Sequence, residues 1–160
     1  MKFIKILFLF MVLAFSSCNN HERLYKNLSI DKEFEPEYLV YDIDEISDEE
    51  KAKLKNCTFV INGEDEFPQE ELMGLEKLKE SNIDFKKYTL LLCYYRLPGI
   101  VAGHVFLLTK DLKNDSFIFT MAFRLDRENE EYDNLFTYYR TAVLVSKIPS
   151  GTDIEFRISH

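Results

Sequence analysis

Residues 88–110 read YTLLLCYYRLPGIVAGHVFLLTK and contain two apolar runs separated by Pro98 and Gly99. The first run, residues 88–96, is almost entirely aliphatic or aromatic, which is typical of a strand covered on both faces. The proline and glycine predict a turn, because both favour backbone angles that reverse the chain. Residues 100–110 then form a second strand. The stretch therefore predicts the centre of a β-sheet.

The chain after residue 110 repeats this order of turn and strand. A turn at 111–116 leads into a strand that places alternate apolar side chains on one face, namely Phe117, Phe119, Met121, Phe123 and Leu125. A charged loop precedes the long strand 135–148, and a second turn precedes the last strand at 153–159. Five strands joined by short links predict an antiparallel meander.

The chain before residue 88 carries helix signals. Ser47 and Glu50 have the spacing of a capping box and open a short helix over 47–56. CTFVI at 57–61 is strand-like, and leucines at helical spacing predict a main helix that starts near Phe67. The expected fold class is α+β, with one or two N-terminal helices packed on an antiparallel β-meander of about five to six strands.

Residues 1–18 have the three parts of a secretory signal. Lys2 and Lys5 supply positive charge, Ile6–Phe15 is an apolar run, and two serines provide small residues for cleavage. The apolar run is too short for a permanent span, which needs about 20 residues.

Cys18 directly follows the two serines, and this arrangement resembles a bacterial lipobox. The resemblance implies that the cysteine sulfur receives a diacylglycerol and that the signal is cut before it. We expect a lipoprotein signal peptide at 1–17, a tether at 18–36 and one domain over 37–160. Asn19 is associated in some Gram-negative bacteria with export to the outer membrane. The alternative is a plain secreted protein.

The formal net charge of −8 bears on the partners. An acidic surface repels phosphate backbones, so no nucleic-acid partner is expected. The expected partners are the membrane, through the N-terminal lipid, and a protein of the cell envelope.

Cys57 and Cys93 are the cysteines that remain, and both lie in strand-like runs. In an oxidising envelope, a leftover pair indicates a disulfide. A free cysteine is also a good small core residue, so both readings stay open.

The sequence lacks the motifs of nucleotide, metal and hydrolase sites, and no catalytic residue, metal or cofactor is expected. A catalytic pair of Cys93 and His104 is conceivable, but the apolar surroundings of the cysteine would raise its pKa. The histidines share no ligand spacing, and the acidic run 126–133 lacks the pattern of a calcium loop.

The tyrosine doublets Tyr94–Tyr95 and Tyr138–Tyr139 lie within predicted strands. One member of each pair should face outward, and outward tyrosines make an amphipathic binding surface. The alternative is that a helix or the tether covers that face.

NIDFKKYTLLL at 82–92 and AVLVSKIPSGTDIEFRIS at 142–159 resemble segments of small lipoproteins of the Bacteroidetes kind. A fainter similarity links Gly99 and Gly103 to a glycine-bearing hairpin in the C-terminal domain of protease-complex accessory subunits. The first resemblance, over about residues 57–159, implies location and fold.

Three functions follow as expectations. The first is a lipid-anchored, non-enzymatic binding or assembly-accessory module of the envelope. The second is an accessory or inhibitor of an envelope protease that pairs through an exposed strand edge. The third is a hydrolase that uses His104 or surface carboxylates.

Overall fold

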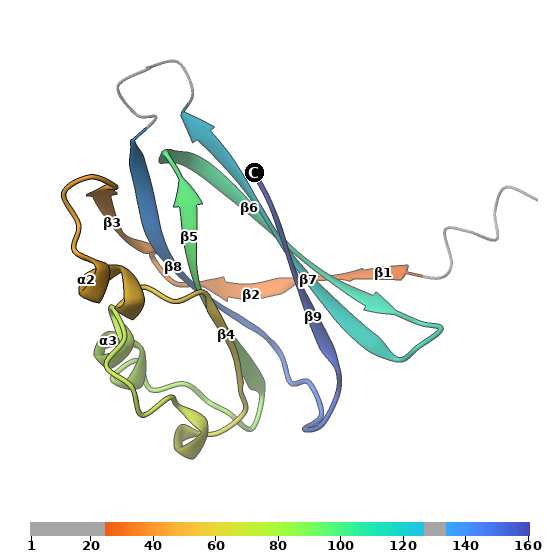
Figure 1. Cartoon of the computed structure of the whole chain (residues 1–160). Coiled ribbons are helices and arrows are strands. Elements are labelled where there is room, and N and C mark those ends of the chain that lie inside the picture. The colour runs from red at the N-terminus through yellow and green to blue at the C-terminus, as the bar shows by residue number, and fades with distance from the viewer. Residues whose placement is uncertain (1–24, 127–133) are drawn as a thin grey trace, which may run out of the picture.

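The computed structural model describes residues 25–126 and 134–160 (Figure 1). Its strands are β1 (Tyr25–Leu28), β2 (Ile30–Glu33), β3 (Glu37–Asp42), β4 (Cys57–Ile61), β5 (Tyr88–Pro98), β6 (Ile100–Asp111), β7 (Ser116–Asp126), β8 (Leu135–Ser146) and β9 (Ile154–Ser159). Its helices are α2 (Asp48–Lys53), α3 (Leu75–Lys79) and a single 3-10 turn, η2 (Glu64–Glu66).

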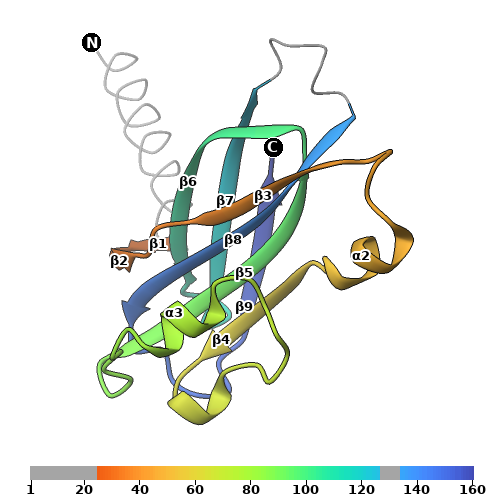
Figure 2. The same cartoon turned by 90° about the vertical axis from the view of Figure 1, so that its left-hand side faces the viewer.

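The strands form two sheets. The four-stranded sheet has the order β1-β6-β7-β9, and the five-stranded sheet has the order β2-β8-β5-β4. β3 also pairs with the first part of β8, at residues 135–140, whereas β2 pairs with residues 143–145. The two sheets face each other, and α3 with its flanking loops lies on the other side of the five-stranded sheet (Figures 1 and 2).

Each space between these layers holds one hydrophobic core. The core between the sheets is built from alternate residues of β5, β7 and β8, with Phe119 and Met121 completely buried at its centre. The intervening residues of β5 and β8 point the other way and form the second core with Leu75 and Leu78 of α3. Both faces of β5 are therefore covered, as its continuous apolar sequence predicts.

The predicted fold class, α+β with N-terminal helices on a meander, is wrong. Residues 25–126 and 134–160 are mostly β, with two short helices and two sheets. The predicted strands do form, but the chain leaves the five-stranded sheet at Gly99, whose φ is +75°. It returns for β8 and leaves again for β9, which pairs in parallel with β7. Short links predict adjacency, and β6 and β7 are adjacent as expected, but the links at Gly99 and at residues 147–153 join strands of different sheets.

The main helix predicted from Phe67 is also shorter than expected. α3 begins only at Leu75, after Gly74 in the left-handed conformation with φ +67°. Phe67 is buried among the loop residues instead of opening a helix. The predicted capping box does form, since the Glu50 amide donates to Ser47 Oγ and the Ser47 amide donates to the Glu50 carboxylate.

The predicted tether, residues 18–36, needs a correction for its second half. Residues 25–28 pair with β6 and residues 30–33 pair with β8, so the domain includes them. Leu28 and Ile30 pack against the core between the sheets, which gives this polar segment enough apolar contact to be ordered. The signal peptide, Cys18 and the acidic run 127–133 lie outside the described residues.

Candidate functional site

The tyrosine doublets do not form an outward surface. Tyr94, Tyr95, Tyr138 and Tyr139 are all buried, because one face of the five-stranded sheet meets the other sheet and the other face meets the α3 layer. The hydroxyls of Tyr94, Tyr138 and Tyr139 find internal partners, as buried tyrosines usually do. Tyr94 donates to the Met73 carbonyl at 3.0 Å, and Tyr138 donates to the Lys55 carbonyl at 3.2 Å.

The disulfide, which is one of the two interpretations open from the sequence, is not formed in the structure. Cys57 and Cys93 are free thiols, and their strands pair so that Cys93 lies opposite Thr58 while Cys57 lies opposite Tyr94. Neighbouring residues of a strand point to opposite faces, so one thiol lies in the core between the sheets and the other faces the α3 layer. Of the two interpretations from the sequence, a disulfide or a free cysteine in the core, the second one fits Cys93.

His104 lies at the interface of three strands. Its Nδ1 is 2.8 Å from the Tyr139 hydroxyl, its Nε2 is 2.5 Å from Glu33 Oε1, and its ring stacks on Phe106. Both ring nitrogens are therefore engaged within the protein. Burial raises the pKa of the Cys93 thiol well above its ordinary value, so that thiol is poorly suited to nucleophilic attack.

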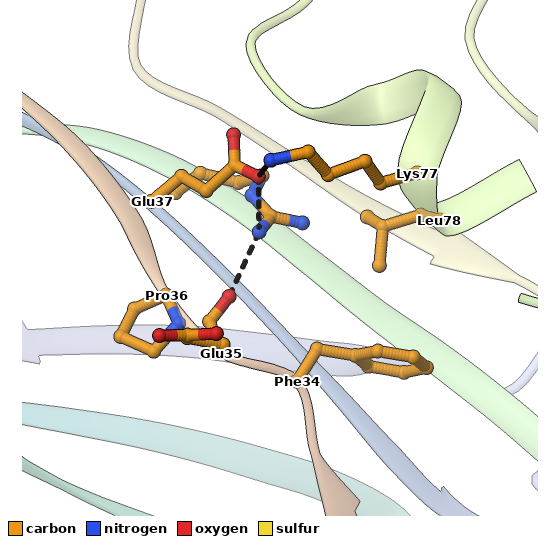
Figure 3. A pocket seen from close by; sticks show the side chains of 7 residues that line it. Phe34, Glu35, Pro36, Glu37, Lys77 and Leu78 are labelled. Atoms are coloured by element: carbon orange, nitrogen blue, oxygen red, sulfur yellow. Dashed lines mark hydrogen bonds and ion pairs between the residues drawn. The ribbon is translucent and has the colours of Figure 1, made fainter.

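A cavity of about 350 Å³ lies between the segment that enters β3 and the helix α3 (Figure 3). It is lined by Phe34, Glu35, Pro36, Glu37, Lys77, Leu78 and Arg140. These residues come from three distant parts of the chain, which the pairing of β3 with β8 and the docking of α3 bring together. The cavity is the candidate binding site.

Arg140 is the most deeply buried charged group that lines this cavity and is only 3% exposed. Its Nη2 donates to the Glu35 carbonyl at 2.9 Å and lies 3.6 Å from Glu37 Oε1. Its Nε is buried and has no hydrogen-bond partner among the residues that the structure describes. A buried charge with incomplete pairing is costly, so it needs an explanation.

Glu37 joins the two cations of the cavity. Lys77 Nζ lies 2.7 Å from Glu37 Oε1, and Figure 3 shows the lysine side chain reaching across to the carboxylate above Leu78. The hydrogen bond from Lys77 lowers the pKa of Glu37, with a further contribution from the charge of Arg140. The carboxylate therefore stays ionised and holds β3 to α3.

Sequence reasoning missed this cavity, although one signal was present. Arg140 stands in LFTYYRTAVLVS, a strand whose other residues predict burial on both faces. An arginine in such a strand must have partners of opposite charge or polarity. The sequence does not show which residues these are, because Glu37 and Lys77 are far away along the chain.

β3 provides a second feature that bears on function. Tyr38, Leu39 and Val40 are 60%, 48% and 42% exposed, which makes β3 a markedly apolar exposed strand. One edge of β3 pairs with β8, and no strand of the described residues pairs with the other edge.

The described residues contain neither a metal-binding cluster nor a helix that could span a membrane. No group of three His, Cys, Asp or Glu side chains within residues 25–126 and 134–160 could hold a metal ion. In the same part of the chain, no helix has the length and apolar character needed to cross a membrane.

Comparison with known proteins gives no match to a family model, to a curated protein or to a solved structure. The resemblance to small lipoproteins, and the fainter one to protease-complex accessory subunits, therefore stay predictions.

Proposed function

We propose that this protein is a lipid-anchored, non-enzymatic binding module of the bacterial envelope, and that it holds an extended segment of a partner protein against the free edge of β3. The observation that carries the proposal is the geometry of that edge. Natural sheets normally protect edge strands with charges, proline or a bulge in order to avoid unwanted pairing. The centre of β3, residues 38–41, is Tyr-Leu-Val-Tyr and has none of these within it.

The backbone of β3 shows which groups a partner would meet. The Ile43 amide donates to the Asn134 carbonyl, and the register continues through β3, with Glu37 opposite Arg140. Hydrogen-bonded pairs alternate along an antiparallel ladder, so Glu37, Leu39 and Tyr41 face β8. The amides and carbonyls of Tyr38, Val40 and Asp42 consequently point outward, which is the arrangement that strand addition uses.

The charge around β3 favours one kind of partner segment. Asp42 is the last residue of the strand, and Asp44, Glu45 and Asp48 follow it closely. A partner strand with apolar residues beside Tyr38 and Val40, and with lysine or arginine beside the acidic end, complements this edge.

The N-terminal anchor is the second part of the proposal. Acylation of Cys18 would add two or three lipid chains, each contributing about 0.8 kcal/mol per buried methylene. The proposed location is the outer membrane of a Gram-negative bacterium, on the basis of Asn19. Mass spectrometry of the N-terminal peptide tests the anchor: we expect an acylated Cys18, and an unmodified thiol would contradict it.

Hydrogen exchange tests the free edge without any partner. We expect the amides of Tyr38, Val40 and Asp42 to exchange much faster than those of Leu39 and Tyr41, because only the second group is bonded to β8. Slow exchange at Tyr38 and Val40 in the isolated protein would mean that the edge is already covered.

Crosslinking in cells tests the partner. A photo-crosslinking residue at Leu39 should capture one envelope protein, whereas the same residue at Leu112, exposed in the turn between β6 and β7, should not. Val40→Pro removes an outward amide without removing a bond to β8, so it should abolish the capture. Val40→Thr keeps the amide and serves as the matched control.

One result of the crosslinking experiment would contradict the proposal. Capture at Leu39 that survives Val40→Pro, in a protein with an unchanged unfolding midpoint, would show that strand addition is not involved. If the captured protein is a protease whose activity changes on binding, the accessory or inhibitor role becomes the specific form of this function. We propose no catalytic role for His104, because a substrate would have to displace Tyr139 or Glu33 from its ring nitrogens.

A further inference from the structure

We infer that the cavity beside Arg140 is a binding site for the carboxylate group of an organic anion with a small apolar body. This site is distinct from the outer edge of β3, and the inference does not depend on the proposed pairing. It starts from the incomplete pairing of one buried guanidinium group that lines the cavity.

Arg140 has more hydrogen-bond capacity than its neighbours use. A guanidinium carries five N–H donors. Among the described residues, the interactions of this group are one carbonyl bond from Nη2 and a 3.6 Å contact with Glu37, while Nε has no partner. Arginine binds carboxylates well because its planar fork matches their two oxygens.

Glu37 does not complete the pairing of Arg140. Its Oε1 lies closer to Lys77, at 2.7 Å, than to Arg140 Nη2, at 3.6 Å. The internal carboxylate is therefore shared, and its tighter contact is with a lysine whose side chain is 77% exposed. Glu35 also lines the cavity, but its side chain is exposed and forms no ion pair with either cation among the described residues. The buried guanidinium of Arg140 therefore keeps capacity for a carboxylate of its own.

The other walls of the cavity select the rest of the ligand. Phe34, Pro36 and Leu78 line it with apolar surface, and Figure 3 shows Phe34 and Leu78 on the side away from Glu37. Its volume of about 350 Å³ suits a short branched or linear chain. A free carboxylic acid and the C-terminal carboxylate of a peptide share this chemistry.

Gly74 keeps the site compact. A Cβ at this position would lie 3.0 Å from Arg140 Nε and closer still to the Glu37 carboxylate, so only glycine allows the loop to approach both groups. The cavity thus has a buried cation and a shared carboxylate, and the backbone at Gly74 packs closely beside both groups.

The first experiment is a nuclear magnetic resonance titration of the purified protein with 4-methylpentanoate, and with 4-methylpentanamide as the neutral control. We expect saturable shifts at Gly74, Leu78 and the Arg140 guanidinium with the acid alone. Acetyl-Val-Leu with a free or an amidated C-terminus distinguishes the source, since a peptide site should prefer the free peptide to the small acid.

Matched variants test the assigned residues. Lys77→Ala should weaken the binding of the acid roughly fivefold, as expected for one exposed charge. Lys79→Ala, on the same helix but outside the cavity, should leave it unchanged.

Glu37→Gln tests the charge argument directly. Removing the internal carboxylate should make the added acid bind more tightly, and the acid should raise the unfolding midpoint of this variant more than that of the wild-type protein. Shifts that are equal for acid and amide, no saturable shift with any probe, or loss of tight binding in Glu37→Gln would each overturn the inference.

Discussion

Two properties of glycine are needed at position 74, namely a backbone that can adopt a positive φ and the lack of a side chain. Its φ of +67° is in the left-handed region, and its missing side chain leaves space for Glu37 and Arg140. Gly151 has a similar φ of +81°, but a Cβ there would meet nothing within 4 Å. Comparing alanine substitutions at the two glycines therefore separates the free-energy cost of the left-handed backbone from the cost of steric overpacking.

We predict that Gly74→Ala lowers the free energy of unfolding by about 3 kcal/mol, from left-handed strain together with overpacking. Gly151→Ala should cost only about 1 kcal/mol, since it carries the conformational penalty alone. Urea denaturation of both variants measures the difference, and equal losses would show that the loop at residue 74 has room to move.

Arg140 shows how much the sequence predicts about the environment of a single residue. Its place in an apolar strand indicates a buried charge that must be paired. Its partners cannot be read, because residues 37, 77 and 140 approach one another only after β3, α3 and β8 are in place. The tyrosine doublets failed as predicted surface residues for a related reason: the sequence of a strand does not show which layers cover its faces.

At the scale of the element, α2 and α3 differ in what holds them. α3 buries Leu75 and Leu78 in a core, whereas α2 has no buried residue. α2 therefore depends on local interactions, chiefly the capping box between Ser47 and Glu50. The same interactions made it predictable from sequence.

We predict that Ser47→Ala destabilises α2 locally by about 1 kcal/mol, the usual value for loss of an N-cap. Amides of α2 should exchange faster, while the global unfolding midpoint should change little because no core contact is lost. Glu49→Ala, which removes only an exposed ion pair with Lys53, is the control and should have a smaller effect. An equal loss of global stability would contradict this view of α2.

β3 illustrates the limit of prediction for an element. Its aromatic and β-branched composition and its length are those of an ordinary strand, so its existence is consistent with the sequence. That its outer edge has no neighbouring strand among the described residues follows only from its place beside β8. The feature on which the proposed function depends is thus a property of the assembled sheet.

At the scale of the whole molecule, the layers act through burial. The α3 layer and the four-stranded sheet together cover both faces of β5 and β8, and this burial raises the pKa of Tyr138 and of Tyr139 from 10 to about 12. The pKa values of Tyr94 and Tyr95 are raised by the same cause. Because the folded pKa is above the unfolded one, neutral phenols stabilise the fold below pH 10.

We predict that this stabilisation is lost as the pH rises from 10 toward 12, where the unfolded chain releases tyrosine protons before the folded protein does. The urea midpoint should fall over this window, and it should fall less steeply in Tyr138→Phe, which lacks one of these phenols. Titration of lysines affects both proteins alike. An equal slope in the two proteins would show that Tyr138 is not shielded by the layers.

The sequence by itself determined the features that repeat over a few residues. These are the positions of the long strands, the capping box before α2, and the coverage of β5 on both faces, since apolar period and hydrogen-bonding side chains act within one element. Tertiary structure alone decided which sheet each strand joins, the parallel pairing of β9, the free edge of β3 and the meeting of Glu37, Lys77 and Arg140. The physical reason is that these outcomes depend on which distant surfaces bury one another, and that choice is made by the competition among all layers at once.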